Sequence, residues 1–284
     1  ITQNVDGLHK SSGINEKKII EVHGNARRAG CIKCNQKFPV ELILEKFKES
    51  NEPPLCNRCG GFVKSATVSF GQSMPKILVS AGIHGDEPAG VEAILTFLEQ
   101  HLPRWRDQFH FDVFPCLNPF GFSHNLRENS DGIDINRTFE DEPTVEARAV
   151  QSVLEHSKYD LFIEFHEDWE YDGFYLFELN ENRLQLGESI TSAVSLIGKL
   201  HQNALVDEYR TSKEAVLRPT SEVRVRGPMP VYLFKRKKAC RTITCETPSS
   251  FWSMSKRVDA HLKALTTALD CLLKENQYRP EFYQ

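Results

Sequence analysis

The stretch that most constrains the fold is Lys76–Gly90, which reads KILVSAGIHGDEPAG. Ile77–Val79 form a short apolar run followed by small residues, which predicts a buried strand that ends in a loop. The loop carries His84 and Glu87, and an imidazole and a carboxylate at this spacing can point at one cation. Zinc accepts nitrogen and oxygen ligands at about 2.0–2.2 Å and keeps an open position in catalytic sites. H-x-x-E alone is a weak signal, so the interpretation depends on the later chain.

Two later apolar segments end in residues that could complete such a site. Tyr159–His166 predicts a second strand with His166 at its end, and Arg241–Pro248 predicts a third strand that carries Glu246. Neighbouring strands of a mixed sheet bring their C-terminal ends to one crevice, so His166 can reach the cation held by the H-x-x-E turn. Glu246 then suits a general base that takes a proton from the attacking water. Read singly, His166 is a satisfied strand-end histidine, and Glu246 is a solvated charge or a helix N-terminal residue.

Between these strands lies a polar loop, Arg127–Arg137, which reads RENSDGIDINR. It has little regular periodicity, and a connector of this length is costly to order, so a binding role is favoured. A guanidinium fork matches the two oxygens of a carboxylate, which makes the two arginines candidates for substrate recognition. The alternative is a surface loop with solvated charges.

The other elements expected after residue 76 complete an α/β pattern. The sequence predicts a helix that Pro103 closes, a strand, a turn and a C-terminal amphipathic helix. These lie, in order, at Gly90–Leu102, Phe109–Pro115, Asn118–Gly121 and Val258–Leu273.

Four cysteines near the N-terminus form two knuckles, Cys31-x-x-Cys34 and Cys56-x-x-Cys59, separated by 21 residues. This spacing is typical of a four-thiolate zinc site, and four thiolates leave no open position for chemistry. The alternatives are two disulfides or free thiols in a reducing compartment. Glu41–Lys48 predicts a short helix between the knuckles.

Charge divides the chain near Pro75. Residues 1–75 carry 11 Lys and Arg against 7 Asp and Glu, whereas the remainder carries 24 against 32. We therefore expect two domains, at residues 1–75 and 76–284. The net charge of -4 argues against a nucleic-acid partner. No segment resembles a membrane span or a signal peptide, so we expect a cytoplasmic protein. The chain begins with Ile1, which suggests a fragment or a processed form.

The segments TQNVDGLH, EVHG and VSFGQSMP resemble the middle of a sirtuin, an NAD-dependent protein deacylase. The resemblance implies that the cysteines hold structural zinc, that His23 is the base, and that Gln3, Asn4 and Asp6 line the nicotinamide-ribose pocket. The glycine-rich turn that holds pyrophosphate does not precede these segments, and the closing strands do not follow them. NAD binding is therefore not expected, and His23 is interpreted as a leftover polar residue.

The later motifs together resemble the zinc carboxypeptidase superfamily, nearest its succinylglutamate desuccinylase and aspartoacylase branch. They are H-x-x-E, N-P-x-G, R-x-N-x-x-G-x-D-x-N-R, a strand-end histidine and T-x-x-E-T-P. The resemblance implies a three-layer α/β/α fold with a mixed sheet. It also implies that His84, Glu87 and His166 are zinc ligands and that Glu246 is the base. Arg127 would stabilise the oxyanion, and Asn136 with Arg137 would bind the carboxylate of the substrate. Carboxypeptidases of this group place a mobile tyrosine before the base. Tyr232 is the nearest candidate here, but its spacing from Glu246 does not match well.

The sequence thus predicts a zinc hydrolase that cleaves an amide bond, in a peptide or an N-acyl amino acid with a free carboxylate. It predicts one catalytic and one structural zinc. Two alternatives from other classes stay open. The first is NAD-dependent deacylation by the N-terminal part. The second is a fusion or assembly chimera whose cysteine module is non-catalytic, and a related possibility is a hydrolase fold that only binds its ligand.

Overall fold

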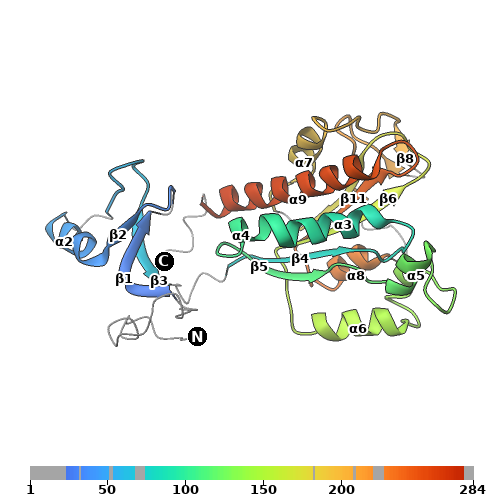
Figure 1. Ribbon diagram of the computed structural model, residues 1–284, viewed down its shortest axis with the longest axis horizontal. Coiled ribbons are helices and arrows are strands. Elements are labelled where there is room, and N and C mark those ends of the chain that lie inside the picture. The colour runs from blue at the N-terminus through green and yellow to red at the C-terminus, as the bar shows by residue number, and fades with distance from the viewer. Residues whose placement is uncertain are drawn as a thin grey trace. The chain divides into compact units, whose positions relative to one another are not determined.

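The computed structural model describes residues 24–31, 33–50, 54–67, 74–181, 183–206, 209–219 and 227–277. By its internal contacts the chain divides into two compact units, Ile1–Ser73 and Met74–Gln284 (Figure 1). The sirtuin-like candidates Gln3, Asn4, Asp6 and His23 lie outside the described residues.

Within its described residues, the first unit is a small three-stranded antiparallel sheet in the order β2-β1-β3, with one helix. Its elements are β1 Gly24–Cys31, β2 Lys37–Pro39, α2 Val40–Ser50 and β3 Val63–Thr67. Of the side chains described in this unit, few apolar ones are buried, among them Ala29, Ile43 and Val63, and the cysteines pack with them. A core this small is the kind that a metal or disulfides usually reinforce.

The second unit contains the remaining described elements. Its strands are β4 Lys76–Ala81, β5 His110–Phe114, β6 Leu161–Asp168, β7 Tyr175–Asn180, β8 Leu205–Val206, β9 Tyr209–Arg210, β10 Val216–Leu217 and β11 Arg241–Pro248. Its helices are α3 Pro88–Thr96, the π-helical η2 Phe97–His101, α4 Leu102–Trp105, α5 Pro119–His124, the 3-10 helix η3 Ile135–Arg137, α6 Val145–Leu154, α7 Gly187–Val194, α8 Met229–Lys235 and α9 Met254–Gln277.

A six-stranded mixed sheet in the order β10-β7-β11-β6-β4-β5 organises this unit. Strands β5, β4, β6 and β11 run parallel, while β7 pairs antiparallel with β11. Strand β11 lies between β6 and β7, although those two are consecutive in sequence. The C-terminal ends of β4, β6 and β11 therefore meet at one edge of the sheet, where polar residues follow each strand.

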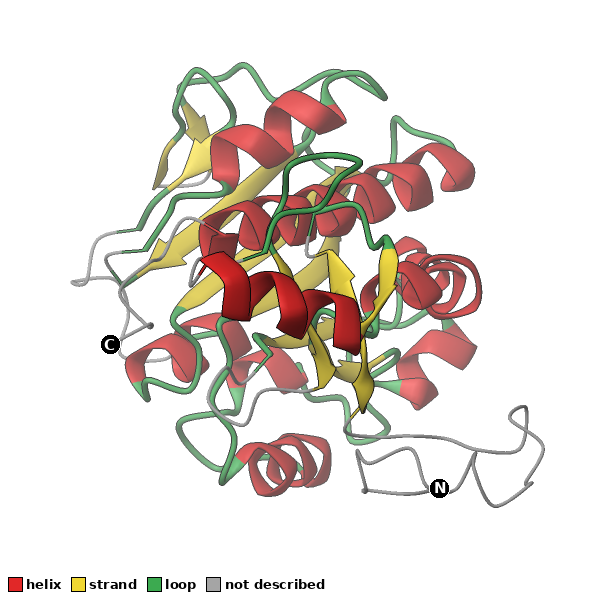
Figure 2. Cartoon of the chain, turned by 90° about the vertical axis from the view of Figure 1, so that its left-hand side faces the viewer, coloured by secondary structure: helices red, strands yellow, loops and turns green. Residues whose placement is uncertain are grey.

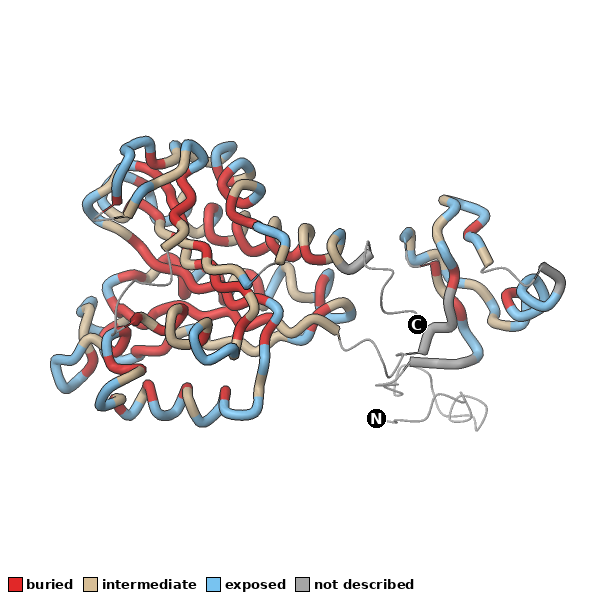
Figure 3. The backbone as a smooth tube through the Cα atoms, turned by 180° about the vertical axis from the view of Figure 1, so that it is seen from behind, coloured by how far each residue is buried: buried red, intermediate tan, exposed pale blue. Residues whose placement is uncertain are grey.

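Helices cover both faces of the sheet and give the predicted three-layer α/β/α fold (Figures 1 and 2). Side chains alternate along each strand, so Ile163 and Ile243 face the core formed with α3, α7 and α9. Leu78 and Phe162 face the other core, which includes residues of α6 and α8. Strands β4 and β6 are buried along almost their whole length (Figure 3).

Two local predictions were wrong. Pro103 does not close the helix that begins after Glu87, because the chain widens into the π-helix η2 and continues through α4 to Trp105. A π-helical turn accommodates the proline, which lacks an N–H and clashes with the carbonyl four residues earlier in an α-helix. Residues 118–121 are not a simple turn: Asn118 caps the short helix α5, and its side-chain oxygen accepts from the Gly121 N–H.

Candidate functional site

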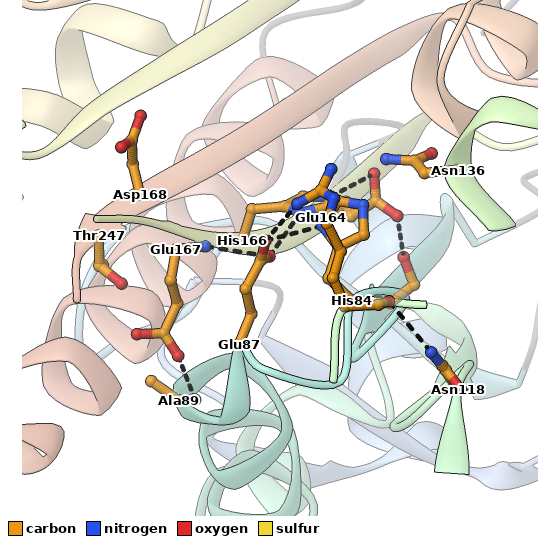
Figure 4. Close-up of polar contacts among 12 residues, drawn as sticks. His84, Glu87, Ala89, Asn118, Asn136, Glu164, His166, Glu167, Asp168 and Thr247 are labelled. Carbon is orange, nitrogen blue, oxygen red and sulfur yellow. Dashed lines mark hydrogen bonds and ion pairs between the residues drawn. The ribbon is translucent and has the colours of Figure 1, made fainter. Parts of the chain in front are cut away.

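His84, Glu87 and His166 converge at the C-terminal edge of the sheet (Figure 4). One donor atom from each lies within 4.8 Å of the others, and all three residues are buried. Nδ1 of His84 and Nδ1 of His166 each lie 2.7 Å from a different oxygen of the Glu87 carboxylate. The turn after β4, the start of α3 and strand β6 thus bring two imidazoles and one carboxylate to a common point.

Two glycines allow the turn that carries His84. Gly82 has φ +63°, in the left-handed region that other residues rarely adopt. A Cβ on Gly85 would lie 1.9 Å from the carbonyl carbon of Gly121, so only glycine permits the turn to approach α5 this closely. The backbone of the H-G-D-E segment is therefore fixed against the next loop.

Each histidine has a second carboxylate behind it, on the nitrogen that faces away from Glu87. Nε2 of His84 lies 3.3 Å from Oδ1 of Asp134, and Nε2 of His166 lies 3.2 Å from Oε2 of Glu164. Carboxylates in this position orient metal-ligating histidines and fix the ring nitrogen that faces the metal. Each imidazole thus lies between Glu87 and a second carboxylate, an arrangement that could hold a metal ion.

The charge of the cluster also fits a cation. Burial lowers the pKa of His166, but Glu87 and Glu164 outweigh it and hold that pKa well above its ordinary value. Burial raises the pKa of Glu87, but the two imidazoles outweigh it and hold it far below its usual range. Without a cation the imidazoles thus keep protons among several carboxylates, and a divalent ion is the group that replaces those protons.

Glu246 stands beside His166 in the sheet. The two residues are register partners in the parallel pair β11 and β6, so their side chains point to the same face. Burial raises the pKa of Glu246 well above the ordinary value, and the charges of Glu87, Asp168 and Glu164 add to this. A carboxylate with a raised pKa suits proton transfer near neutral pH.

Arg127 reaches the same place from the polar loop. Its Nη1 donates to Glu87 Oε1 at 3.4 Å, and its Nε and Nη2 donate to Asp134 Oδ2 at 3.2 and 3.1 Å. Asn118 holds this part of the loop, because its amide donates to the carbonyls of Arg127 and Glu128. The N-P-x-G motif thus positions the arginine.

The two residues proposed to bind the substrate carboxylate, Asn136 and Arg137, differ in their exposure to solvent. Asn136 is buried, and its side-chain oxygen accepts from the Met229 N–H at the start of α8. Arg137 is exposed. Both line the cavity described below. Tyr232 does not line it and packs on Phe139 with ring centroids 5.6 Å apart.

A cavity of about 1130 Å³ opens onto the cluster. It follows the face of β11 that carries Thr242, Thr244 and Glu246, and aromatic residues such as Phe177 and Tyr209 form part of its wall. Its lining also includes His84, Glu87, His166, Arg127, Asn136 and Arg137. Small-molecule sites typically measure about 300–1000 Å³, so this one has room for a substrate longer than one amino acid.

The first unit contains a second candidate metal centre. The sulfur atoms of Cys31, Cys34, Cys56 and Cys59 all lie within 4.8 Å of one another, and none of these cysteines forms a disulfide. Burial raises the pKa of Cys31, but the backbone N–H groups of Cys34 and Lys33 outweigh it and bring that pKa to about 6. The backbone N–H of Gly61 lowers the pKa of Cys59, but the neighbouring thiols and burial outweigh it and raise that pKa to about 12. A thiolate is the form that binds zinc, so this cluster could hold the metal that the spacing predicts.

Sequence reasoning missed Glu164 and Asp134 as site residues. The alternation of β6 contained a signal for Glu164, because residues 164 and 166 lie two apart and face the same side. A carboxylate at that position in an apolar strand is costly unless it has a partner, and its burial at 0% exposure makes the partner necessary. Nothing in the local pattern links Asp134 to His84, which lies 50 residues earlier.

Two family models match the chain. Residues 73–212 match the succinylglutamate desuccinylase/aspartoacylase catalytic domain, and residues 1–89 match the Sir2 family. Both predicted resemblances are therefore confirmed.

Solved structures resemble the second unit's fold. A candidate metallopeptidase from Shewanella amazonensis aligns with a TM-score of 0.60 at 20% identity, over 82% of this chain and 91% of that one. A metallo-carboxypeptidase from Burkholderia cenocepacia aligns with a TM-score of 0.54 at 19% identity, over 70% and 57% of the two chains. These likenesses show the fold of the second unit.

Curated relatives resemble the first quarter. NAD-dependent protein deacetylase 2 of Caldanaerobacter subterraneus subsp. tengcongensis is 47% identical over 75 residues, which are 26% of this chain and 29% of that protein. The deacetylase of Rhodopseudomonas palustris is also 47% identical over 75 residues, at 26% and 30% of the two chains. The chain thus spans about three tenths of the length of these relatives.

None of the helices in the described part of the chain is long and apolar enough to cross a membrane.

Proposed function

We propose that the second unit is a zinc-dependent hydrolase of amide bonds in substrates that carry a free carboxylate. The observation that carries the proposal is the convergence of His84, Glu87 and His166, with Glu246 beside His166 and Arg127 over the same point. His84, Glu87 and His166 would hold the ion. Bound there, zinc would polarise the scissile carbonyl and make a water molecule more acidic.

The side chains of this chain then divide the remaining work. Glu246 takes the proton of the attacking water and passes it to the leaving amine. Arg127 donates hydrogen bonds to the oxygen on which negative charge develops, as a preorganised cation does at an oxyanion. Arg137, with Asn136, binds the substrate carboxylate, because a guanidinium matches its two oxygens. The size of the cavity favours a peptide over a single N-acyl amino acid.

The first unit is proposed as a separate zinc-ribbon domain whose four cysteines hold a structural ion. Its four-thiolate set leaves no position for a substrate. We assign the hydrolytic activity to residues 74–284 alone.

The test is hydrolysis of matched substrate pairs by the purified full chain. Short peptides and N-acyl amino acids are each supplied with a free and with an amidated C-terminus. The proposal expects turnover of free-carboxylate substrates, little turnover of the amidated partners, and no turnover in His84→Ala. Equal rates on both members of each pair would contradict the proposed binding of the substrate carboxylate. Undiminished rates in His84→Ala would contradict the proposed metal centre.

A further inference from the structure

Glu87 stands at the N-cap position of a helix but does not cap it with its side chain. It is the N-cap residue of α3, where a side chain normally accepts a hydrogen bond from one of the first free N–H groups. Its carboxylate makes no such bond, because both oxygens face the two histidines. The next residue, Pro88, has no N–H, so Ala89 carries the first donor that needs a partner.

That partner comes from another element. Oε1 of Glu167, at the end of β6, accepts from the Ala89 N–H at 2.7 Å. In return, the Glu167 backbone N–H donates to Oε2 of Glu87 at 3.2 Å. The two carboxylates thus exchange partners: each accepts from a backbone N–H of the other's segment, as the two side chains of a capping box do within one helix. Figure 4 shows Glu167 turned toward Ala89 and Glu87 turned toward His166.

A third element completes the link. Oε2 of Glu167 forms an ion pair with Arg257, near the start of α9, and the Glu167 side chain is fully buried. A buried carboxylate without a cation would be costly, so Arg257 supplies the partner that the Glu167 side chain needs at the N-terminus of α3. The dipole of α3 also stabilises a negative charge at this end of the helix.

We propose that Glu167 is a positioning residue that holds the Glu87 carboxylate in register with His166, and that its ion pair with Arg257 holds the Glu167 side chain in place for this purpose. The inference rests on the proposed metal centre. Glu167 lies next to His166 in sequence and bonds the residue two positions after Glu87, so it fixes the spacing between two of the three proposed ligands. Its loss should weaken metal binding before it affects the fold.

The test compares two conservative variants that each remove a buried ion pair of α9. Glu167→Gln keeps the size of the side chain and an oxygen for Ala89, but it loses the charge. Glu275→Gln is the matched control, because Glu275 pairs with the buried Arg241 at the opposite end of β11. Zinc affinity of the full chain is measured by competition with a chelator. The difference in bound zinc between wild type and His84→Ala gives the amount of zinc that this site binds.

We expect Glu167→Gln to weaken zinc binding at this site about 10–100-fold, as loss of a supporting group typically does. Glu275→Gln should bind zinc as the wild type does, with both metal-free variants melting at similar temperatures. Unchanged zinc affinity in Glu167→Gln would overturn the inference, and so would an equal loss in Glu275→Gln. If wild-type and His84→Ala proteins bind the same amount of zinc, the proposed function itself fails.

A second variant covers the case in which Glu167→Gln does not fold because Arg257 is left unpaired. Glu167→Gln combined with Arg257→Gln removes both charges and leaves two amides of similar shape. The double variant should fold and still bind zinc about 10–100-fold more weakly than the wild type. Wild-type affinity in the double variant would overturn the role of the charged pair.

Discussion

Glu246 and His166 are direct register partners on the adjacent parallel strands β11 and β6. Because partners in register point to the same face, the proposed base stands beside a proposed ligand without any loop to hold it. The relationship explains why two segments 80 residues apart in sequence can form one site.

Replacement of Glu246 by Gln tests the proposed base. The amide cannot take up a proton, so we expect turnover to fall by roughly 100–10,000-fold. Zinc content should stay unchanged, because the side chain is not one of the three proposed ligands. Steady-state kinetics with the best free-carboxylate peptide, together with metal analysis of the same sample, measure both effects. Normal turnover would remove the assigned role.

Replacement of Arg127 by Ala tests the proposed oxyanion donor. Removal of one such donor usually lowers turnover about 100–1000-fold, and we expect a loss in that range with zinc retained. Arg127→Lys is the matched control, since it keeps a positive charge without the fork, and it should recover part of the rate. A wild-type rate in Arg127→Ala would contradict the assignment.

Glu164 offers a test of the support behind His166. Glu164→Gln removes the charge that lies 3.2 Å from Nε2 of His166. We expect zinc affinity to fall about 10–100-fold. The exposed Glu92, on α3, provides a control whose change to Gln should leave affinity unaltered. Equal affinities in the two variants would show that Glu164 does not orient the ring.

Metal counting separates the two proposed zinc sites. Full-length wild-type protein should contain two zinc ions per chain, and Cys31→Ser and His84→Ala should each lose one. Because the two clusters belong to different compact units, Cys31→Ser should keep its hydrolytic rate. Mass spectrometry under native conditions gives the count. Loss of both ions in either single variant would refute independent sites.

The buried His261 predicts a pH dependence of stability. It is fully buried on α9 beside Phe165 and bonds Thr247. Burial lowers its pKa from 6.5 to about 3, with the charges of His166 and Arg257 adding to the effect. Between these values the unfolded chain binds one more proton than the folded chain, so the free energy of unfolding rises with pH. The stabilisation is complete above pH 6.5 and is lost as the pH falls toward 3.

Urea unfolding followed by tryptophan fluorescence measures this effect, since the chain's three tryptophans, Trp105, Trp169 and Trp252, all lie in the second unit. We expect His261 to contribute a slope of up to about 1.4 kcal/mol per pH unit between pH 4 and 6. His261→Gln should lack this slope. An identical pH dependence in the two proteins would show that His261 is not the titrating group.

Much of the second unit could be predicted because its strands are short apolar runs with polar ends. That pattern placed His166 and Glu246 correctly at one edge of the sheet. The N-P-x-G motif was read as a turn, since the pattern of four residues does not reveal that Asn118 would cap a helix and hold the Arg127 loop. The role of Glu167 could not be read from sequence at all, because it depends on the backbone of α3.

The position of β11 between β6 and β7 affects the order in which the protein can mature. During synthesis, β6 and β7 leave the ribosome long before residues 241–248, yet they have no direct pairing with each other in the finished sheet. Strand β11 is the element that pairs with both of them. A chain truncated before residue 241 would therefore hold both histidines but lack the strand that carries Glu246, so the proposed base joins the proposed ligands only after β11 has paired with β6.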